Sequence, residues 1–216
     1  LFNGTFEKSE NVIDRNRMLD MSLVGNGQRI QVDSAQWTEK DSITFLNFKT
    51  GGPGTWVAGV STAAKNIALD AKSFNDYLEH DGVVDMLEWR KDNNALDQDA
   101  VEKYSKHVKT IFQVGEVLSD DWKTALGYPI EFIPQENPYD IHAGHSLKVQ
   151  LLYKGKPLAN QLVVIGSDVS GESSMVEHSH DGGEPHTHKS GETPDHDHNS
   201  GLQLRTDDTG ILEFEF

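Results

Sequence analysis

Short segments in which apolar and polar residues alternate recur along most of this chain, and turn-forming residues separate them. The clearest pair is 21–24 and 29–32, joined through Gly25-Asn26-Gly27. An Asn-Gly connection between two such segments is a strong local signal for a β-hairpin. Many short strands with frequent turns favour a β-sandwich. Further strands are expected at residues 42–48, 56–61, 108–114, 130–134, 147–153, 161–165, 202–205 and 211–216.

The middle of the chain departs from this alternation. Ser73 is a candidate N-cap for a helix in which Phe74 and Leu78 share one face, and Gly82 is its expected stop. The helices form a short insertion, at about residues 71–106, in a mainly β chain. Two more short helices are expected at 84–90 and 97–105.

Composition excludes several classes of protein. The chain has 216 residues, with four Trp, nine Phe and five Tyr, which is typical of a folded protein. Its formal charge is -16, from 35 acidic against 19 basic residues, so its surface repels nucleic acids and anionic lipids. No run approaches the roughly 20 apolar residues that a membrane helix needs. The chain has no cysteine, which leaves imidazoles and carboxylates as its strong metal ligands.

The segment between Ser173 and Ser200 concentrates six of the ten histidines. They form three His-x-His pairs, and in extended backbone residues i and i+2 point to the same side. Neutral imidazole is the commonest side-chain ligand for divalent transition metals. The predicted metal ligands are therefore His178, His180, His186, His188, His196 and His198.

The length of this segment is a second sign of a function. It connects the strands expected at 161–165 and 202–205, where a hairpin needs only a few residues. Six imidazoles can complete one octahedral site or two three-histidine sites for Ni²⁺, Co²⁺, Zn²⁺ or Cu²⁺. The alternative is a solvated, low-complexity loop whose histidines are incidental.

Four histidines lie outside this segment. His142 and His145 flank a turn beside Asp140, and we expect them to supply additional ligands if the long loop folds back. The alternative is that both are ordinary turn residues at the surface. We expect His80 and His107 to be structural.

The sequence does not indicate an enzyme. A catalytic metal site needs three fixed ligands, an open position and a nearby general base. Here the ligands lie on one glycine-rich connection, which suits capture of an ion better than catalysis. The chain also has no nucleophile elbow, no phosphate-binding glycine loop and no His-Glu-x-x-His.

Several motifs are similar to those of a known family, over residues 6–216. The chain resembles bacterial periplasmic proteins known as the periplasmic component of a cobalt/nickel transport system. The motifs that carry the resemblance are Phe74-Asn75-Asp76-Tyr77-Leu78 with Asp81-Gly82, Arg90, 102–110, 113–115, 126–134, 137–139 and Gly155-Lys156-Pro157-Leu158.

The resemblance implies a protein secreted to the periplasm by an N-terminal signal that this chain does not contain. It implies two β-sandwich regions, immunoglobulin-like or prealbumin-like, and we expect residues of the natural protein beyond both ends. The expected domains are 1–125, which carries the helical insertion, and 126–216, a prealbumin-like sandwich with the histidine-rich insertion loop 167–201.

Together these observations predict a periplasmic protein that binds Ni²⁺, Co²⁺ or Zn²⁺ and captures or buffers the ion for an uptake system. Its expected partners are the metal ion and a membrane metal-uptake transporter, without nucleic acid and without membrane insertion. The alternative is a non-catalytic β-sandwich module of the cell envelope that binds carbohydrate or another protein.

Overall fold

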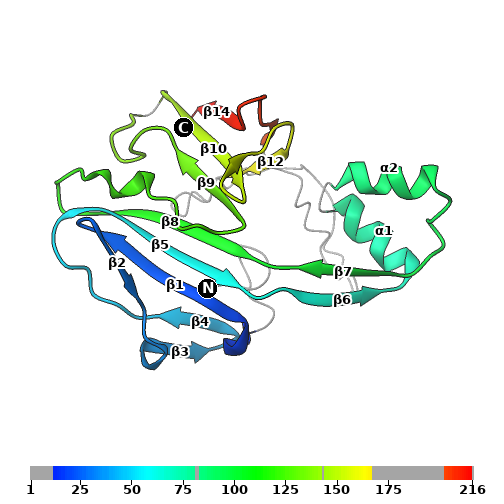
Figure 1. Ribbon diagram of the computed structural model, residues 1–216, viewed down its shortest axis with the longest axis horizontal. Helices are drawn as coiled ribbons and strands as arrows, with labels where there is room; N and C mark the ends of the chain where they lie inside the picture. Colours follow the sequence, from blue (N-terminus) through cyan, green and yellow to red (C-terminus); the bar gives the residue numbers. More distant parts are fainter. Residues whose placement is uncertain (1–11, 81–82, 143, 167–201, 216) are drawn as a thin grey trace, which may run out of the picture.

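The computed structural model describes residues 12–80, 83–142, 144–166 and 202–215 (Figure 1). Within these ranges the chain is mainly β, and its strands pair antiparallel in several sheets. The predicted fold class is therefore confirmed: a β-sheet protein with a short helical segment. None of the helices in these ranges is long and apolar enough to span a lipid bilayer.

A four-stranded sheet forms the middle layer of the molecule, with the strand order β2-β1-β5-β8 (Figure 1). Asn26 and Gly27, with φ angles of 51° and 72°, form the turn between β1 and β2, as the sequence predicts. The strands are β1 (Met18–Gly25), β2 (Gln28–Gln31), β5 (Gly54–Thr62) and β8 (His107–Val114).

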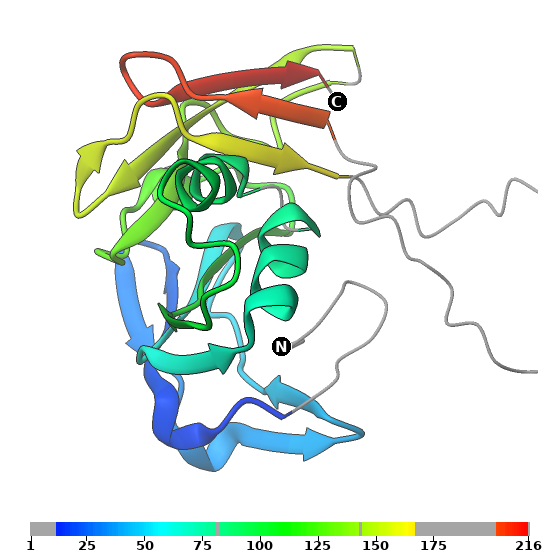
Figure 2. The same cartoon turned by 90° about the vertical axis from the view of Figure 1, so that its right-hand side faces the viewer.

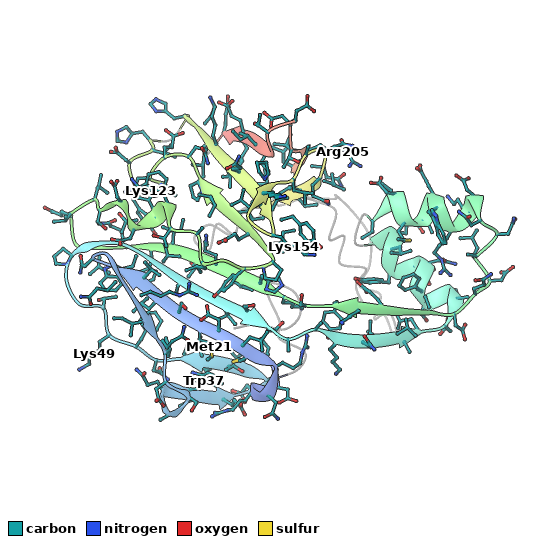
Figure 3. The ribbon with its side chains drawn as sticks, in the orientation of Figure 1. Met21, Trp37, Lys49, Lys123, Lys154 and Arg205 are labelled. Atoms are coloured by element: carbon teal, nitrogen blue, oxygen red, sulfur yellow. The ribbon has the colours of Figure 1, made fainter. Side chains whose placement is uncertain are left out.

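A small hairpin covers one face of this sheet. It consists of β3 (Trp37–Lys40) and β4 (Ile43–Leu46). Trp37 of the hairpin packs with Met21 and Val60 of the sheet in one buried cluster; Trp37 and Met21 are labelled in Figure 3. Burial of these apolar side chains holds the hairpin on the sheet.

The C-terminal strands lie on the opposite side of the central sheet (Figure 1). The buried side chains of Leu126 and Tyr128 pack there against Val24 and Val57. The predicted boundary between residues 125 and 126 remains a prediction. The C-terminal strands that form one sheet are β9 (Ile130–Pro134), β10 (Ser146–Tyr153), β11 (Lys156–Pro157) and β14 (Ile211–Glu215).

A two-stranded ribbon extends from the central sheet and carries the two α-helices at its end (Figures 1 and 2). The buried Arg90 joins the helices, because its side chain donates to Asn75 Oδ1 and stacks on the ring of Phe74. The elements of this arm are β6 (Lys65–Leu69), α1 (Ala71–His80), α2 (Val84–Asp92) and β7 (Ala100–Tyr104).

The arm corrects two predictions. The helix predicted at 97–105 is wrong, because β7 (Ala100–Tyr104) pairs with β6 along its whole length. The expected N-cap of α1 is also wrong in position. The N-cap is Asp70, whose carboxylate accepts a hydrogen bond from the backbone N–H of Ser73 in the first turn of the helix. Short 3-10 helices complete the described chain at Arg15–Arg17, Ser34–Gln36 and Asp120–Lys123.

Candidate metal centre

The two strands that flank the histidine-rich insertion are paired with each other. They are β12 (Leu162–Ile165) and β13 (Leu202–Arg205), and they run antiparallel with Ile165 opposite Leu202. The predicted strands on both sides of the insertion are thus confirmed. The six predicted ligands between them, His178, His180, His186, His188, His196 and His198, lie outside the described residues.

The base of this hairpin is held by Thr206, which follows β13 and is buried. Its hydroxyl donates to the carbonyl oxygen of Leu158 at 2.7 Å and accepts from the N–H of Gln161 at 2.9 Å. Its backbone N–H donates to Gln161 O and its carbonyl accepts from Asn160 N–H. These bonds attach the hairpin to the chain that leaves β11.

Arg205 connects the same hairpin to the helical arm. One guanidinium nitrogen donates to the carbonyl oxygen of Asn160 at 2.9 Å, and another lies 3.4 Å from the carboxylate of Asp85 on α2. Figure 3 shows Arg205 on the side of the C-terminal layer that faces the helices. The strand β13, which follows the insertion, is therefore tied both to the chain before β12 and to α2.

Asp207 shapes the turn from β13 to β14. Its carboxylate accepts from the N–H groups of Ile211 and Thr209 and from the hydroxyl of Thr209. The hydrogen bond from Ile211 is the largest cause that lowers the pKa of this carboxyl. Gly210 completes the turn with φ of 75°, and a β-carbon there would lie 2.9 Å from the carbonyl oxygen of Leu151.

His142 and His145 come together at the start of β10. The N–H of His145 donates to the carbonyl oxygen of His142 at 3.0 Å, which closes the turn. The two rings lie 6.0 Å apart between centroids, with an interplanar angle of 62°, and both side chains are exposed. The structure therefore brings this predicted pair into one place. Among the described residues, no three His, Cys, Asp or Glu side chains converge closely enough to hold a metal ion.

The histidine turn and the anchor of the insertion occupy different parts of the C-terminal layer. In Figure 1 the turn lies at the beginning of β10, and the β12 strand lies well to its right. The turn precedes a strand of the β11-β10-β14 sheet, whereas β12 and β13 form a separate two-stranded sheet.

The ring of His107 is occupied by hydrogen bonds. Its Nδ1 lies 2.9 Å from Ser61 Oγ and its Nε2 lies 2.9 Å from Ser105 Oγ. The ring also lies 6.0 Å from that of Tyr128. Burial lowers the pKa of His107. Both ring nitrogens of His107 thus have a hydroxyl partner, in line with the structural role that the sequence predicts. The side chain of His80 lies outside the described residues.

A second polar cluster, which the sequence did not predict, surrounds Asp20 on β1. Its carboxylate accepts from Tyr128 Oη at 2.6 Å and from Arg29 Nη2 at 2.8 Å. Burial alone would raise the pKa of Asp20, but hydrogen bonds from Tyr128, Gln31 and Ser22 outweigh it and lower the pKa. Burial and the hydrogen bond to Asp20 raise the pKa of Tyr128. This cluster links β1 of the central sheet to Tyr128, which precedes β9, and its contacts are structural.

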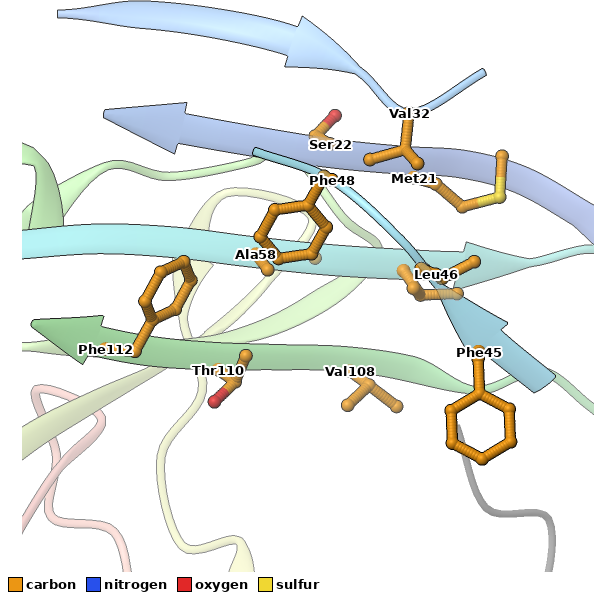
Figure 4. Close-up of a pocket in the computed structure, with 12 residues that line it drawn as sticks. Met21, Ser22, Val32, Phe45, Leu46, Phe48, Ala58, Val108, Thr110 and Phe112 are labelled. Carbon is orange, nitrogen blue, oxygen red and sulfur yellow. The ribbon is translucent and has the colours of Figure 1, made fainter. Parts of the chain in front are cut away.

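An open apolar groove of about 360 Å³ lies between the central sheet and the β3–β4 hairpin (Figure 4). Its lining includes Phe45 of β4, Phe48, and Val108 and Phe112 of β8. Phe45 is 43% exposed and Val108 is 49% exposed. The rings of Phe48 and Phe112 lie 6.1 Å apart. The hairpin therefore leaves part of the sheet face uncovered.

Comparison with known proteins assigns this architecture to a family. No curated protein and no solved structure matches the chain significantly. The model of one family, described as a domain of unknown function, matches residues 5–216. This match covers nearly the whole sequence, including the helical arm and the strands that flank the insertion. The chain therefore belongs to the DUF4198 family.

Proposed function

We propose that this protein binds divalent transition metal ions through the six histidines of its insertion. The ions are Ni²⁺, Co²⁺ or Zn²⁺, and Cu²⁺ is a competitor. The task of the protein is to capture or buffer these ions in the periplasm for a membrane uptake system. It is a binding protein and not an enzyme.

The pairing of Ile165 with Leu202 is the observation that carries this proposal. It brings the two ends of the insertion together, so the six imidazoles belong to one connection that begins and ends at the same place. The hydrogen bonds of Thr206 fix the opposite end of this hairpin to the chain that follows β11. Ligands on one closed connection bind an ion with less loss of chain entropy than ligands on a free tail.

The chemistry of the chain supports the same metals. Because cysteine is absent, the available strong donors are imidazole nitrogen and carboxylate oxygen. The affinity of such donor sets for divalent ions peaks at Cu²⁺. The concentration of each ion in the compartment therefore decides which one is bound. The formal charge of -16 raises the local concentration of cations.

The transport role and the periplasmic location rest on the similarity of the sequence motifs to periplasmic cobalt/nickel transport proteins. The family that matches the chain has no assigned function. A membrane metal-uptake transporter is the partner that this role would require.

One alternative has an observation in its favour. The apolar groove beside Phe45 and Phe112 favours a non-catalytic envelope module that binds a protein or a carbohydrate. A platform of tryptophans for sugar binding is not formed by Trp37 and Trp56, because both are buried. Metal titration separates this alternative from the main proposal.

The test is isothermal titration with Ni²⁺ and Zn²⁺ at pH 7.5, comparing the intact chain with a variant in which the six insertion histidines are Asn. This variant keeps the length and polarity of the insertion. The intact chain is expected to bind at least one ion at least tenfold more tightly than the variant. Equal affinity and stoichiometry in both proteins would overturn the proposal.

The same titration at pH 5.5 tests the nature of the ligands. Metal competes with protons for imidazoles with a reference pKa of about 6.5. The affinity of the intact chain should therefore fall steeply between pH 7.5 and pH 5.5. An affinity that does not change over this range would exclude imidazole ligands.

A further inference from the structure

We infer that His142 and His145 form a second site for one divalent transition metal ion, independent of the histidine-rich insertion. The ion is of the class that prefers nitrogen ligands, such as Cu²⁺, Ni²⁺ or Zn²⁺. The inference goes beyond the proposed function, because it places a site on residues whose geometry the structure describes. It holds whether or not the insertion binds metal.

The separation of the two rings fits a shared ion. A metal–nitrogen bond of about 2.1 Å, added to roughly 1.1 Å from the nitrogen to the ring centroid, puts each centroid about 3.2 Å from the ion. Two rings that share one ion can therefore lie up to about 6.4 Å apart between centroids. The observed separation of 6.0 Å is within this limit, so the two rings are close enough to share one ion once their side chains turn toward it.

Hydrogen bonds tie the chain on both sides of the two histidines to the fold. The hydrogen bond from His145 N–H to His142 O closes the turn, and β10 begins at Ser146 directly after it. Before the turn, Asn137 accepts from the N–H of Tyr139 and donates to the buried hydroxyl of Thr55 in the central sheet. These hydrogen bonds reduce the freedom that the described backbone on both sides of the turn would lose on binding.

The ring nitrogens of this pair are available, in contrast to those of His107. Within the part of the chain that the structure describes, no hydrogen bond or ion pair involves the ring of His142 or His145. At His107 both nitrogens have a serine hydroxyl as partner. The structure describes three histidine side chains. The ring of His107 is engaged by two hydroxyls, and the rings of His142 and His145 can bind an ion.

The site has two protein ligands, and water would fill the other positions. No third His or carboxylate among the described residues converges on it. Two imidazoles bind transition metals but not Mg²⁺ or Ca²⁺, which require sets of oxygen ligands. We therefore expect one ion of modest affinity, selected by nitrogen coordination.

The test uses the full chain with the six insertion histidines replaced by Asn, so that the contribution of the insertion is removed. Titration with Zn²⁺, followed by NMR of the histidine rings, should shift the signals of His142 and His145 together and leave those of His107 unchanged. Isothermal titration with Ni²⁺ should give one ion per chain. Mg²⁺ should produce no shift and no heat.

The matched variant adds His142→Asn and His145→Asn to the same background. It should bind Ni²⁺ at least tenfold more weakly, with an unchanged melting temperature as the control for folding. Undiminished binding in this variant, or absence of binding in the six-substituted chain, would overturn the inference. Failure of the proposed function is a separate result, since it would be seen as equal binding by the intact and six-substituted chains.

Discussion

Lys109 of β8 and Glu131 of β9 form a 2.9 Å ion pair in which the side chains are only 8% and 3% exposed. Lys109 Nζ also donates to the carbonyl oxygens of Thr124 and Phe132. Burial alone would raise the pKa of Glu131, but hydrogen bonds from Lys109 and from the N–H groups of Leu126 and Gly127 outweigh it and lower the pKa. The pair fastens the C-terminal strands to the central sheet.

Removal of one partner of this pair should destabilise the whole protein. Lys109→Met leaves Glu131 buried without its cation, which typically costs about 3–5 kcal/mol of unfolding free energy. The double variant Lys109→Met, Glu131→Gln removes both charges and should recover part of this loss. Urea unfolding of the three proteins measures the difference. A single variant as stable as the wild type would show that the pair does not join the layers.

Gly59 allows the C-terminal segment to approach β5 closely. A β-carbon at this position would overlap Leu126 Cδ1 and would lie 2.6 Å from Tyr128 Oη. Gly59→Ala should therefore lower the unfolding free energy by about 1–3 kcal/mol, the usual cost of overpacking. Gly166→Ala is the control, because a β-carbon there meets no atom of the described residues within 4 Å. Equal melting temperatures for the two variants would contradict this packing.

The burial of His107 predicts a pH dependence of stability. Because burial lowers the pKa of His107 in the folded state, the unfolded chain binds a proton at higher pH than the folded chain. The free energy of unfolding should therefore fall as the pH drops below about 6.5, the reference value for histidine. The groups that face this ring are the hydroxyls of Ser61 and Ser105 and the ring of Tyr128.

The measurement is urea unfolding between pH 7.5 and pH 5.0 for the wild type and His107→Gln. The variant should lose less stability over this range, because its side chain does not titrate. The lowered pKa of Glu131 acts in a different window, since its contribution is lost only as the pH falls below about 4. Parallel pH profiles for the two proteins would refute the role of His107.

The pairing of Ile165 with Leu202 predicts that the fold survives without the insertion. A variant in which a short Asn-Gly turn replaces residues 167–201 should be at least as stable as the wild type, because closing a shorter connection costs about 0.6 kcal/mol less for each halving of its length. Thermal unfolding monitored by circular dichroism measures this. A melting temperature that falls by ten degrees or more would show that the insertion packs on the body of the protein.

The sequence correctly predicted the elements that depend only on residues adjacent in the chain. The Asn26-Gly27 turn forms because few other residue pairs adopt positive φ angles at both positions. The alternation in β10 places Leu147, Val149 and Leu151 in the core, as the period of two requires.

The same reasoning failed where a distant partner decides the conformation. Residues 100–104 are too short for their periodicity to distinguish helix from strand. They form β7 because β6 (Lys65–Leu69) supplies the backbone hydrogen-bond partners. The pair of Lys109 and Glu131 was likewise invisible, since no local pattern shows which charges will meet in the interior.

The sequence alone determined that this protein is mainly β, that it lacks thiolate ligands and that six histidines lie in one insertion between two strands. The tertiary structure decided that these strands pair with each other, and that the rings of His142 and His145 converge on an exposed turn while that of His107 is occupied by two serines. The physical reason is the range of the interactions. Side-chain periodicity and turn geometry are local, but strand pairing and the availability of a ring nitrogen depend on residues far apart in the chain.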